Sequence, residues 1–167
     1  MKKRIVALLA ALLMLCVIGV AVAEVGMTNP WTEADAAQVE AAVGVAFGVP
    51  EGAENVVYRL LEADNLAEMD FTWYDMEYCA RIQPVVGFVE ISGLYMDHWD
   101  QTMDVEIGPW TAVEHRGEMD GVIWNLIQWY DADAGRMYSV LTSGEDLDGF
   151  DIAAAAEAIY APAMEAE

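Results

Sequence analysis

The chain has 167 residues, with 7 basic against 29 acidic side chains and a net charge of −22. This charge excludes nucleic-acid binding through phosphate contacts, because such binding depends on a basic surface. Hydrophobic residues make up 56% of the chain, which excludes disorder driven by charge. The composition therefore predicts a globular domain with a substantial core.

Residues 1–23 have the three parts of a secretory signal peptide. A basic start of two lysines and an arginine precedes an apolar stretch over residues 5–22. Small side chains at Ala21 and Ala23 then predict cleavage before Glu24. The alternative is an uncleaved anchor, because the apolar stretch is long enough to span a thinned bilayer. Either outcome predicts a protein that is secreted or held at the cell envelope.

Cleavage would leave one domain over residues 24–162 and a short frayed tail over residues 163–167. It would also leave a single cysteine, Cys79, which cannot form an internal disulfide. We expect Cys79 to be a small residue packed in a strand. The alternative is a reactive or pairing thiol.

Apolar residues follow helical spacing at both ends of this domain. Thr32 followed by Asp35 predicts a helix start, and the helical pattern then continues as far as Gly48. After Gly149 the helical spacing returns, and it is expected to end before Pro162. The sequence thus predicts an N-terminal and a C-terminal helix.

Seven segments between the two helices have the composition or two-residue period of strands. Tyr74 with Asp75, and the loop over 131–135, connect four of them as two hairpins. In the first hairpin polar residues alternate with apolar ones, so we expect one face of the hairpin to be exposed to solvent. The predicted class is α+β, with an antiparallel sheet of about 5–7 strands and helices on one face. The segments are 56–62, 66–73, 76–82, 102–107, 110–116, 122–130 and 137–142.

The strand over 122–130 is apolar on both faces. We expect a central strand that is covered on both sides, with Trp124 in the core. The alternative is a partly exposed apolar face, formed by Ile123, Ile127 and Trp129, that receives a ligand or another protein.

No catalytic motif is present in the sequence. The serines lack the flanking glycines of a nucleophile elbow, and His98 and His115 lack metalloprotease spacing. Asp97 and Asp100 beside His98 are expected to form a solvated loop rather than a metal site. Residues 146–151 lack the first and last ligands of a calcium loop. We therefore predict no cofactor, no metal and no catalytic residue, with a carboxylate-dependent extracellular hydrolase as the alternative.

The last third of the chain runs from Trp129 through Gly135 and Tyr138 to an apolar helix with Ile152 and Ile159. This part resembles an uncharacterised extracytoplasmic domain family of Gram-positive bacteria, in which a hairpin of this type precedes a short amphipathic helix. Such domains often belong to anti-sigma-type regulators. The resemblance implies a half-barrel, as in lipoprotein carriers and periplasmic sigma regulators, and a role in sensing a ligand or a protein. It implies no catalytic residue.

These observations predict an exported, acidic, non-catalytic module at the cell envelope. Its expected partner is a protein, a peptide or a small apolar ligand, and not a nucleic acid. Membrane contact is expected only if the N-terminal segment stays uncleaved. A structural cell-envelope protein is a further alternative to the hydrolase.

Overall fold

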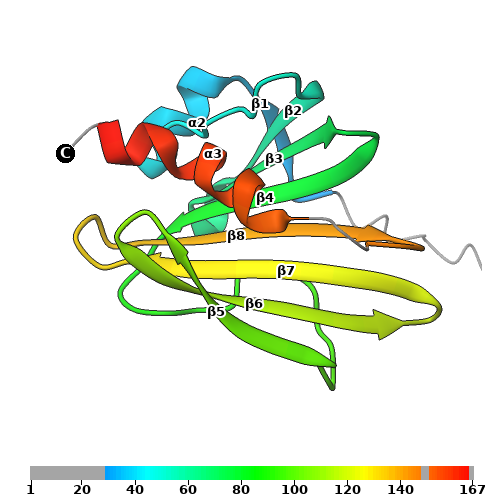
Figure 1. The fold of residues 1–167 in the computed structure, drawn as a ribbon. Helices are drawn as coiled ribbons and strands as arrows, with labels where there is room; N and C mark the ends of the chain where they lie inside the picture. The colour runs from blue at the N-terminus through cyan, green and yellow to red at the C-terminus, as the bar shows by residue number, and fades with distance from the viewer. Residues whose placement is uncertain (1–28, 148–150, 166–167) are drawn as a thin grey trace, which may run out of the picture.

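The computed structural model describes residues 29–147 and 151–165, and the predicted signal peptide lies outside them. One antiparallel sheet of eight strands carries two helices (Figure 1). This is the predicted α+β class with more strands than the expected 5–7. Neither α2 nor α3 is long and apolar enough to cross a membrane. In chain order the elements are β1 (Thr32–Ala34), α2 (Ala36–Val43), β2 (Glu54–Leu61), the short 3-10 helix η1 (Glu62–Asp64), β3 (Leu66–Trp73), β4 (Met76–Pro84), β5 (Gln101–Ile107), β6 (Trp110–Met119), β7 (Val122–Asp131), β8 (Arg136–Gly144) and α3 (Ile152–Glu165).

The strands form two four-stranded meanders, β1 to β4 and β5 to β8. The sheet order is β1-β2-β3-β4-β8-β7-β6-β5, so the meanders join along β4 and β8, where Tyr78 lies opposite Thr142. Each meander carries one stacked aromatic pair across its last hairpin. The rings of Phe71 and Tyr78, and those of Trp129 and Tyr138, have centroids 4.9 Å apart and planes 5° apart. The two halves of the sheet therefore have the same aromatic stacking across corresponding hairpins.

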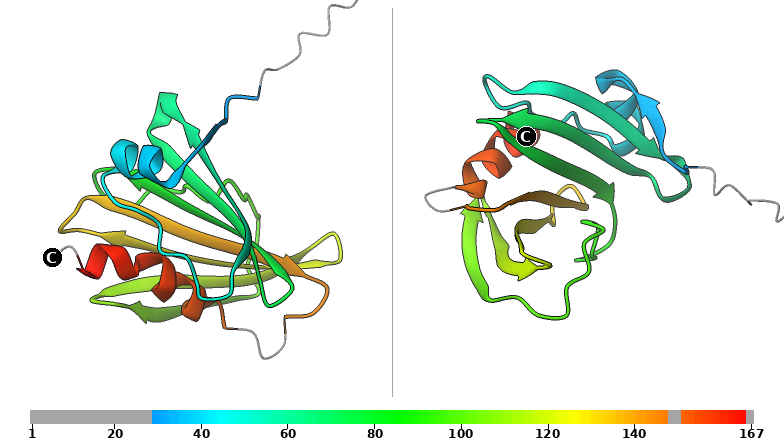
Figure 2. Two further views of the ribbon diagram at one scale, coloured as in Figure 1. Left: turned by 90° about the horizontal axis from the view of Figure 1, so that it is seen from above. Right: turned by 90° about the vertical axis from the view of Figure 1, so that its right-hand side faces the viewer.

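The two faces of the bent sheet have different covers (Figure 2). Helices α2 and α3 pack on one face, called here the helix face, which includes one row of paired residues: Met69, Ala80, Val140 and Ile127. The segment 85–100, which connects β4 to β5, packs on the opposite face through Ile91, next to Leu66 and Met137. We call this second side the loop face. The neighbouring row of paired residues lies on it: Arg59, Glu68, Arg81, Ser139 and Gln128.

Aromatic side chains join α3 to the helix face. The ring of Tyr160 meets the rings of Trp129 and Tyr138 edge-on, with centroids 5.8 and 5.2 Å away. Its hydroxyl donates to Oδ2 of the buried Asp131 at 2.9 Å and accepts from Trp110 Nε1 at 2.6 Å. The Tyr160 hydroxyl, the Trp110 N–H and Oδ2 of Asp131 thus all have hydrogen-bond partners, which burial of polar groups requires. These bonds set the rotation of α3 on the sheet.

Helix α2 begins later and ends earlier than its apolar spacing predicts. Asp35, rather than Thr32, is its N-cap, because Thr32 is extended in β1 opposite Leu60. The carboxylate of Asp35 accepts from the backbone N–H of Gln38, and the Gln38 side chain accepts from the backbone N–H of Asp35. The helix ends at Gly44, whose φ of 76° is left-handed. The buried apolar residues that follow belong to an irregular segment instead of a third helical turn.

Helix α3 continues through Pro162, where we expected it to end. The proline removes only the N–H that would bond to the carbonyl of Ala158. Gly48 packs against that region, with its N–H donating to the Ile159 carbonyl at 2.9 Å, and a Cβ on Gly48 would lie 1.8 Å from Ala158 O. Ala163 is buried in the core. The predicted frayed tail is therefore wrong for the described part of this helix.

Candidate functional site

A pocket of about 400 Å³ lies at the end of the sheet that carries the β3–β4 turn. All of its lining residues belong to β2, β3, β4, β7 and β8. Its loop-face side chains come from two neighbouring rows of the sheet, and they include polar groups as well as the apolar surfaces of Trp124 and Leu141. The lining residues are Asn55, Asp70, Phe71, Thr72, Glu77, Tyr78, Cys79, Trp124, Leu141, Thr142 and Ser143.

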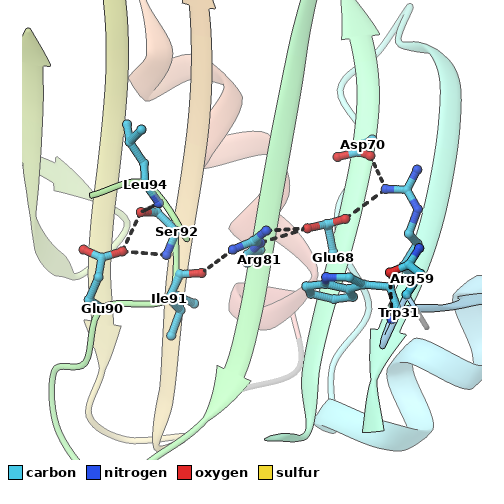
Figure 3. Close-up of polar contacts among 10 residues, drawn as sticks. Trp31, Arg59, Glu68, Asp70, Arg81, Glu90, Ile91, Ser92 and Leu94 are labelled. Atoms are coloured by element: carbon cyan, nitrogen blue, oxygen red, sulfur yellow. Dashed lines mark hydrogen bonds and ion pairs between the residues drawn. The ribbon is translucent and has the colours of Figure 1, made fainter. Parts of the chain in front are cut away.

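A chain of ion pairs borders this pocket on the loop face (Figure 3). Glu68 is buried and lies between two arginines, at 2.9 Å from Arg59 Nη1 and 2.7 Å from Arg81 Nη2. Arg59 also contacts Asp70, which lines the pocket. Hydrogen bonds with Asp70 and then Glu68 raise the pKa of Arg59 above its ordinary value. Asp70 is therefore held at the pocket wall by a cation that Glu68 holds in turn.

Arg81 connects this chain to the loop that covers the face. Its Nη1 donates to the Ile91 carbonyl at 3.0 Å, and its guanidinium lies 5.2 Å from the centre of the Trp31 ring. The loop has a second attachment at Glu90, whose Oε1 accepts from Gln128 Nε2 at 3.1 Å. Arg81 and Gln128 both belong to the loop-face row of paired residues. The row that holds Glu68 beside the pocket therefore also holds the covering segment 85–100.

Cys79 lies in the pocket wall, but its thiol is not activated. Burial raises its pKa above the ordinary value of 9, and the negative charge of Glu68 adds to this effect against the opposing effect of Arg81. A thiol acts as a nucleophile only when it ionises, so Cys79 is unreactive near neutral pH. The expectation of a small residue packed in a strand fits this position better than a reactive thiol does.

Glu68, Asp70 and Cys79 are close enough to be considered as metal ligands, because their ligand atoms lie within 4.8 Å of one another. However, Arg59 already contacts both carboxylates. A metal ion would have to displace this guanidinium and would lie beside a second one on Arg81. The cluster is therefore better described as a set of ion pairs than as a metal centre.

The apolar face proposed from β7 is not a surface. Ile127 and Trp129 have no exposed area, because they face α3 and form part of the core on the helix face. Ile123 is partly exposed but lies near the other end of β7, beside Arg116 and Glu118. The three residues do not form a binding face, and that alternative was wrong.

Trp124, and not Trp129, is the tryptophan of β7 that offers an apolar surface to a possible ligand. It lies on the loop face of β7, is partly exposed and lines the pocket, whereas we had expected it in the core. Its Nε1 is buried and has no hydrogen-bond partner among the described residues. Trp124 therefore presents the carbon surface of its indole to the pocket, not its N–H group.

The first hairpin differs from its predicted pattern in the same region. Its polar side was expected to be wet, but Glu68 on that side is buried under the loop and the ion pairs. The signal was present in the composition, because beyond residue 4 the chain has only four arginines. Two of these, Arg59 and Arg81, stand in strands at positions that can reach Glu68.

The two histidines lie apart from the pocket. His98 is exposed, with Nε2 4.0 Å from Asp100, which agrees with the expected solvated loop. His115 stacks on Trp99 with centroids 5.1 Å apart and contacts Thr102 through Nδ1. Burial lowers the pKa of His115, and Glu90 opposes this effect. The segment 146–151 lies partly outside the described residues.

Comparisons with family models, curated proteins and solved structures give no match to this chain. The resemblance to an extracytoplasmic family thus remains a prediction.

Proposed function

We propose that this protein is an exported, non-catalytic module that binds a small molecule in the pocket of the loop face. The observation that carries the proposal is the lining, in which Trp124 and Leu141 supply carbon surface and Asp70, Thr72 and Ser143 supply polar atoms. A volume of about 400 Å³ is near the lower end of the roughly 300–1,000 Å³ of small-molecule sites. The ligand is thus a compact molecule with an apolar and a polar part.

The strands and ion pairs that hold the pocket wall favour binding by a preformed site. All five strands that line the pocket lie inside the sheet, and only the short β1 lies beyond β2. Asp70 is held by Arg59, and Arg59 by the buried Glu68. A wall that is fixed before the ligand arrives lowers the entropy cost of binding. On this view the bent sheet works as a half-barrel whose polar groups are already oriented.

A fragment screen by NMR on the ¹⁵N-labelled protein tests this function. We expect hits to shift the amide signals of Thr72, Cys79 and Ser143, which line the pocket from β3, β4 and β8. Ser143→Phe should fill the pocket and abolish these shifts. The matched control is Thr111→Phe on the exposed side of β6, which should leave binding unchanged. Hits that shift only other residues, or that survive Ser143→Phe, would refute the proposal.

Export is the second part of the proposal and rests on the N-terminal sequence. If cleavage occurs between Ala23 and Glu24, the protein from the culture supernatant begins at Glu24. Mass spectrometry of the secreted and membrane fractions measures this directly. A product of full precursor mass in the membrane would replace cleavage by anchoring, and a product found only in the cytoplasm would end the export proposal.

A further inference from the structure

The charged side chains that line the pocket are all acidic. Asp70 and Glu77 are the charged groups among the lining residues, and Glu77 is exposed at the rim. The Asp70 side chain is 37% exposed, and Arg59 contacts only its Oδ2 in the described structure. The carboxylates at the wall thus remain accessible to a positively charged ligand, whereas an anion would meet repulsion.

The apolar part of the lining suits the same kind of ligand. Trp124 offers indole carbon to the pocket, because its Nε1 is buried. Indole carbon is an apolar surface against which the apolar part of a ligand is buried favourably. Leu141 lies beside Trp124 and extends the carbon surface. A bare metal ion would leave this surface unused in a pocket of about 400 Å³.

The field of the whole protein acts in the same direction. The net charge is −22, and beyond residue 4 the chain has only four arginines and no lysine. Such a charge raises the local concentration of cations and lowers that of anions around any open site. Charge complementarity, pocket size and the indole surface thus favour one class of ligand.

We propose that the pocket binds a small amphipathic cation, an organic amine or ammonium group on a compact apolar body. The cationic group lies between Asp70 and Glu77, and the apolar body lies against Trp124 and Leu141. This inference rests on the proposed binding function and adds the chemical class of the ligand. It requires no covalent step.

Three probes of equal chain length test the class of ligand: hexylamine, hexanol and hexanoate at neutral pH. Titration of the full-length domain, followed by calorimetry and by amide shifts, measures each affinity. We expect hexylamine to bind about tenfold more tightly than hexanol, which corresponds to about 1.4 kcal/mol. Hexanoate should bind most weakly. Salt at about 1 M should reduce the preference for the amine, because it shortens the Debye length to about 3 Å.

A charge-removing variant separates a local effect from the field of the whole protein. Glu77→Gln should weaken hexylamine several-fold and leave hexanol unchanged, since the backbone carbonyl of Glu77 keeps its bond to Thr142 Oγ1. Glu40→Gln removes one charge from the exposed side of α2 and should change neither affinity.

The outcomes distinguish the two proposals. Equal or tighter binding of hexanol or hexanoate, with shifts at the pocket, would overturn the cation class and leave the binding function standing. Equal losses in Glu77→Gln and Glu40→Gln would also overturn it, because the preference would then come from the overall field. If no probe shifts a pocket residue and the fragment screen also finds no hit there, both proposals fail.

Discussion

The two faces of the sheet are both covered near its centre, but the covers differ in chemistry. On the helix face, α2 and α3 bury a continuous apolar core in which Trp129, Tyr138 and Tyr160 form an aromatic cluster. On the loop face, one connecting segment covers a row that includes Glu68 and Arg81, and beside this row a pocket is open. One face of the sheet thus forms the apolar core, and the other carries the ion pairs and the pocket.

The difference shows where stability and specificity come from in this fold. Apolar burial on the helix face stabilises the native state in proportion to area. Buried ion pairs on the loop face add little net stability, because desolvation offsets their attraction. What those pairs provide is position, since Arg59 and Arg81 fix Glu68 and Asp70 at the edge of the pocket. We therefore expect mutations on the two faces to separate stability from binding.

The largest expected effect is at Trp129. Trp129→Ala should lower the free energy of unfolding by about 3–5 kcal/mol, because a large cavity would remain beneath α3. Trp124→Ala, on the loop face, should cost about 1–2 kcal/mol, because that ring is partly exposed, yet it should weaken ligand binding. Urea unfolding measures both. Equal losses of stability would contradict the contrast between the faces.

Glu68→Gln should have the next largest effect on stability. It would leave Arg81 facing a neutral amide in a mostly buried place, at a cost of about 3 kcal/mol. Asp104→Asn, on the exposed part of β5, is the matched loss of one acid and should change stability little. The double variant Glu68→Gln, Arg81→Gln should recover part of the loss. If the double variant is no more stable than the single one, Glu68 does not act through Arg81.

Gly48→Ala tests the close contact between the segment after α2 and the part of α3 that precedes Pro162. A Cβ at this position would meet the Ala158 carbonyl, so the segment would have to move away from the helix. We expect a cost of about 2 kcal/mol in thermal or urea unfolding. Val49→Ala, at the exposed neighbouring position, should have almost no effect. A neutral Gly48→Ala would mean that α3 can shift without loss.

The smallest effect concerns Cys79 and appears only at alkaline pH. Its raised pKa keeps the folded thiol neutral at a pH where the unfolded thiol ionises. The stability that depends on the neutral thiol is complete below the ordinary pKa of 9. As the pH rises above 9 the free energy of unfolding falls, with a slope of at most about 1.4 kcal/mol per pH unit. Cys79→Ala should flatten the loss of stability between pH 9 and 10. An unchanged slope would show that the thiol does not contribute.

Much of the architecture followed from local pattern. The two-residue period located β2 to β8 closely, and Tyr74 and Asp75 are the two turn residues of the β3–β4 hairpin, both with positive φ. In the second hairpin, Asp131 pairs with Arg136, so the turn has one residue fewer than expected. β1 was missed because three residues are too short for a periodic signal.

The assignment of faces could not be derived in the same way. The strand β7 is apolar on both sides, so its sequence does not say which side α3 covers, and the roles of Trp124 and Trp129 were exchanged. The polar side of β3 looked solvent-exposed because alternation reports polarity and not burial. Only the tertiary pairing of Glu68 with arginines from β2 and β4 reveals that it is buried.

The junction between the two meanders has a consequence for how the chain folds. Among the described strands, every pairing except β4 with β8 joins strands that are consecutive in the sequence. The exception brings Tyr78 to Thr142 and must close a long loop before any bond forms. Each meander can thus assemble early from local contacts, while their union is the slow event. We expect substitutions along this seam, such as Val140→Ala, to slow refolding, and the protein to complete its sheet only after β8 leaves the ribosome.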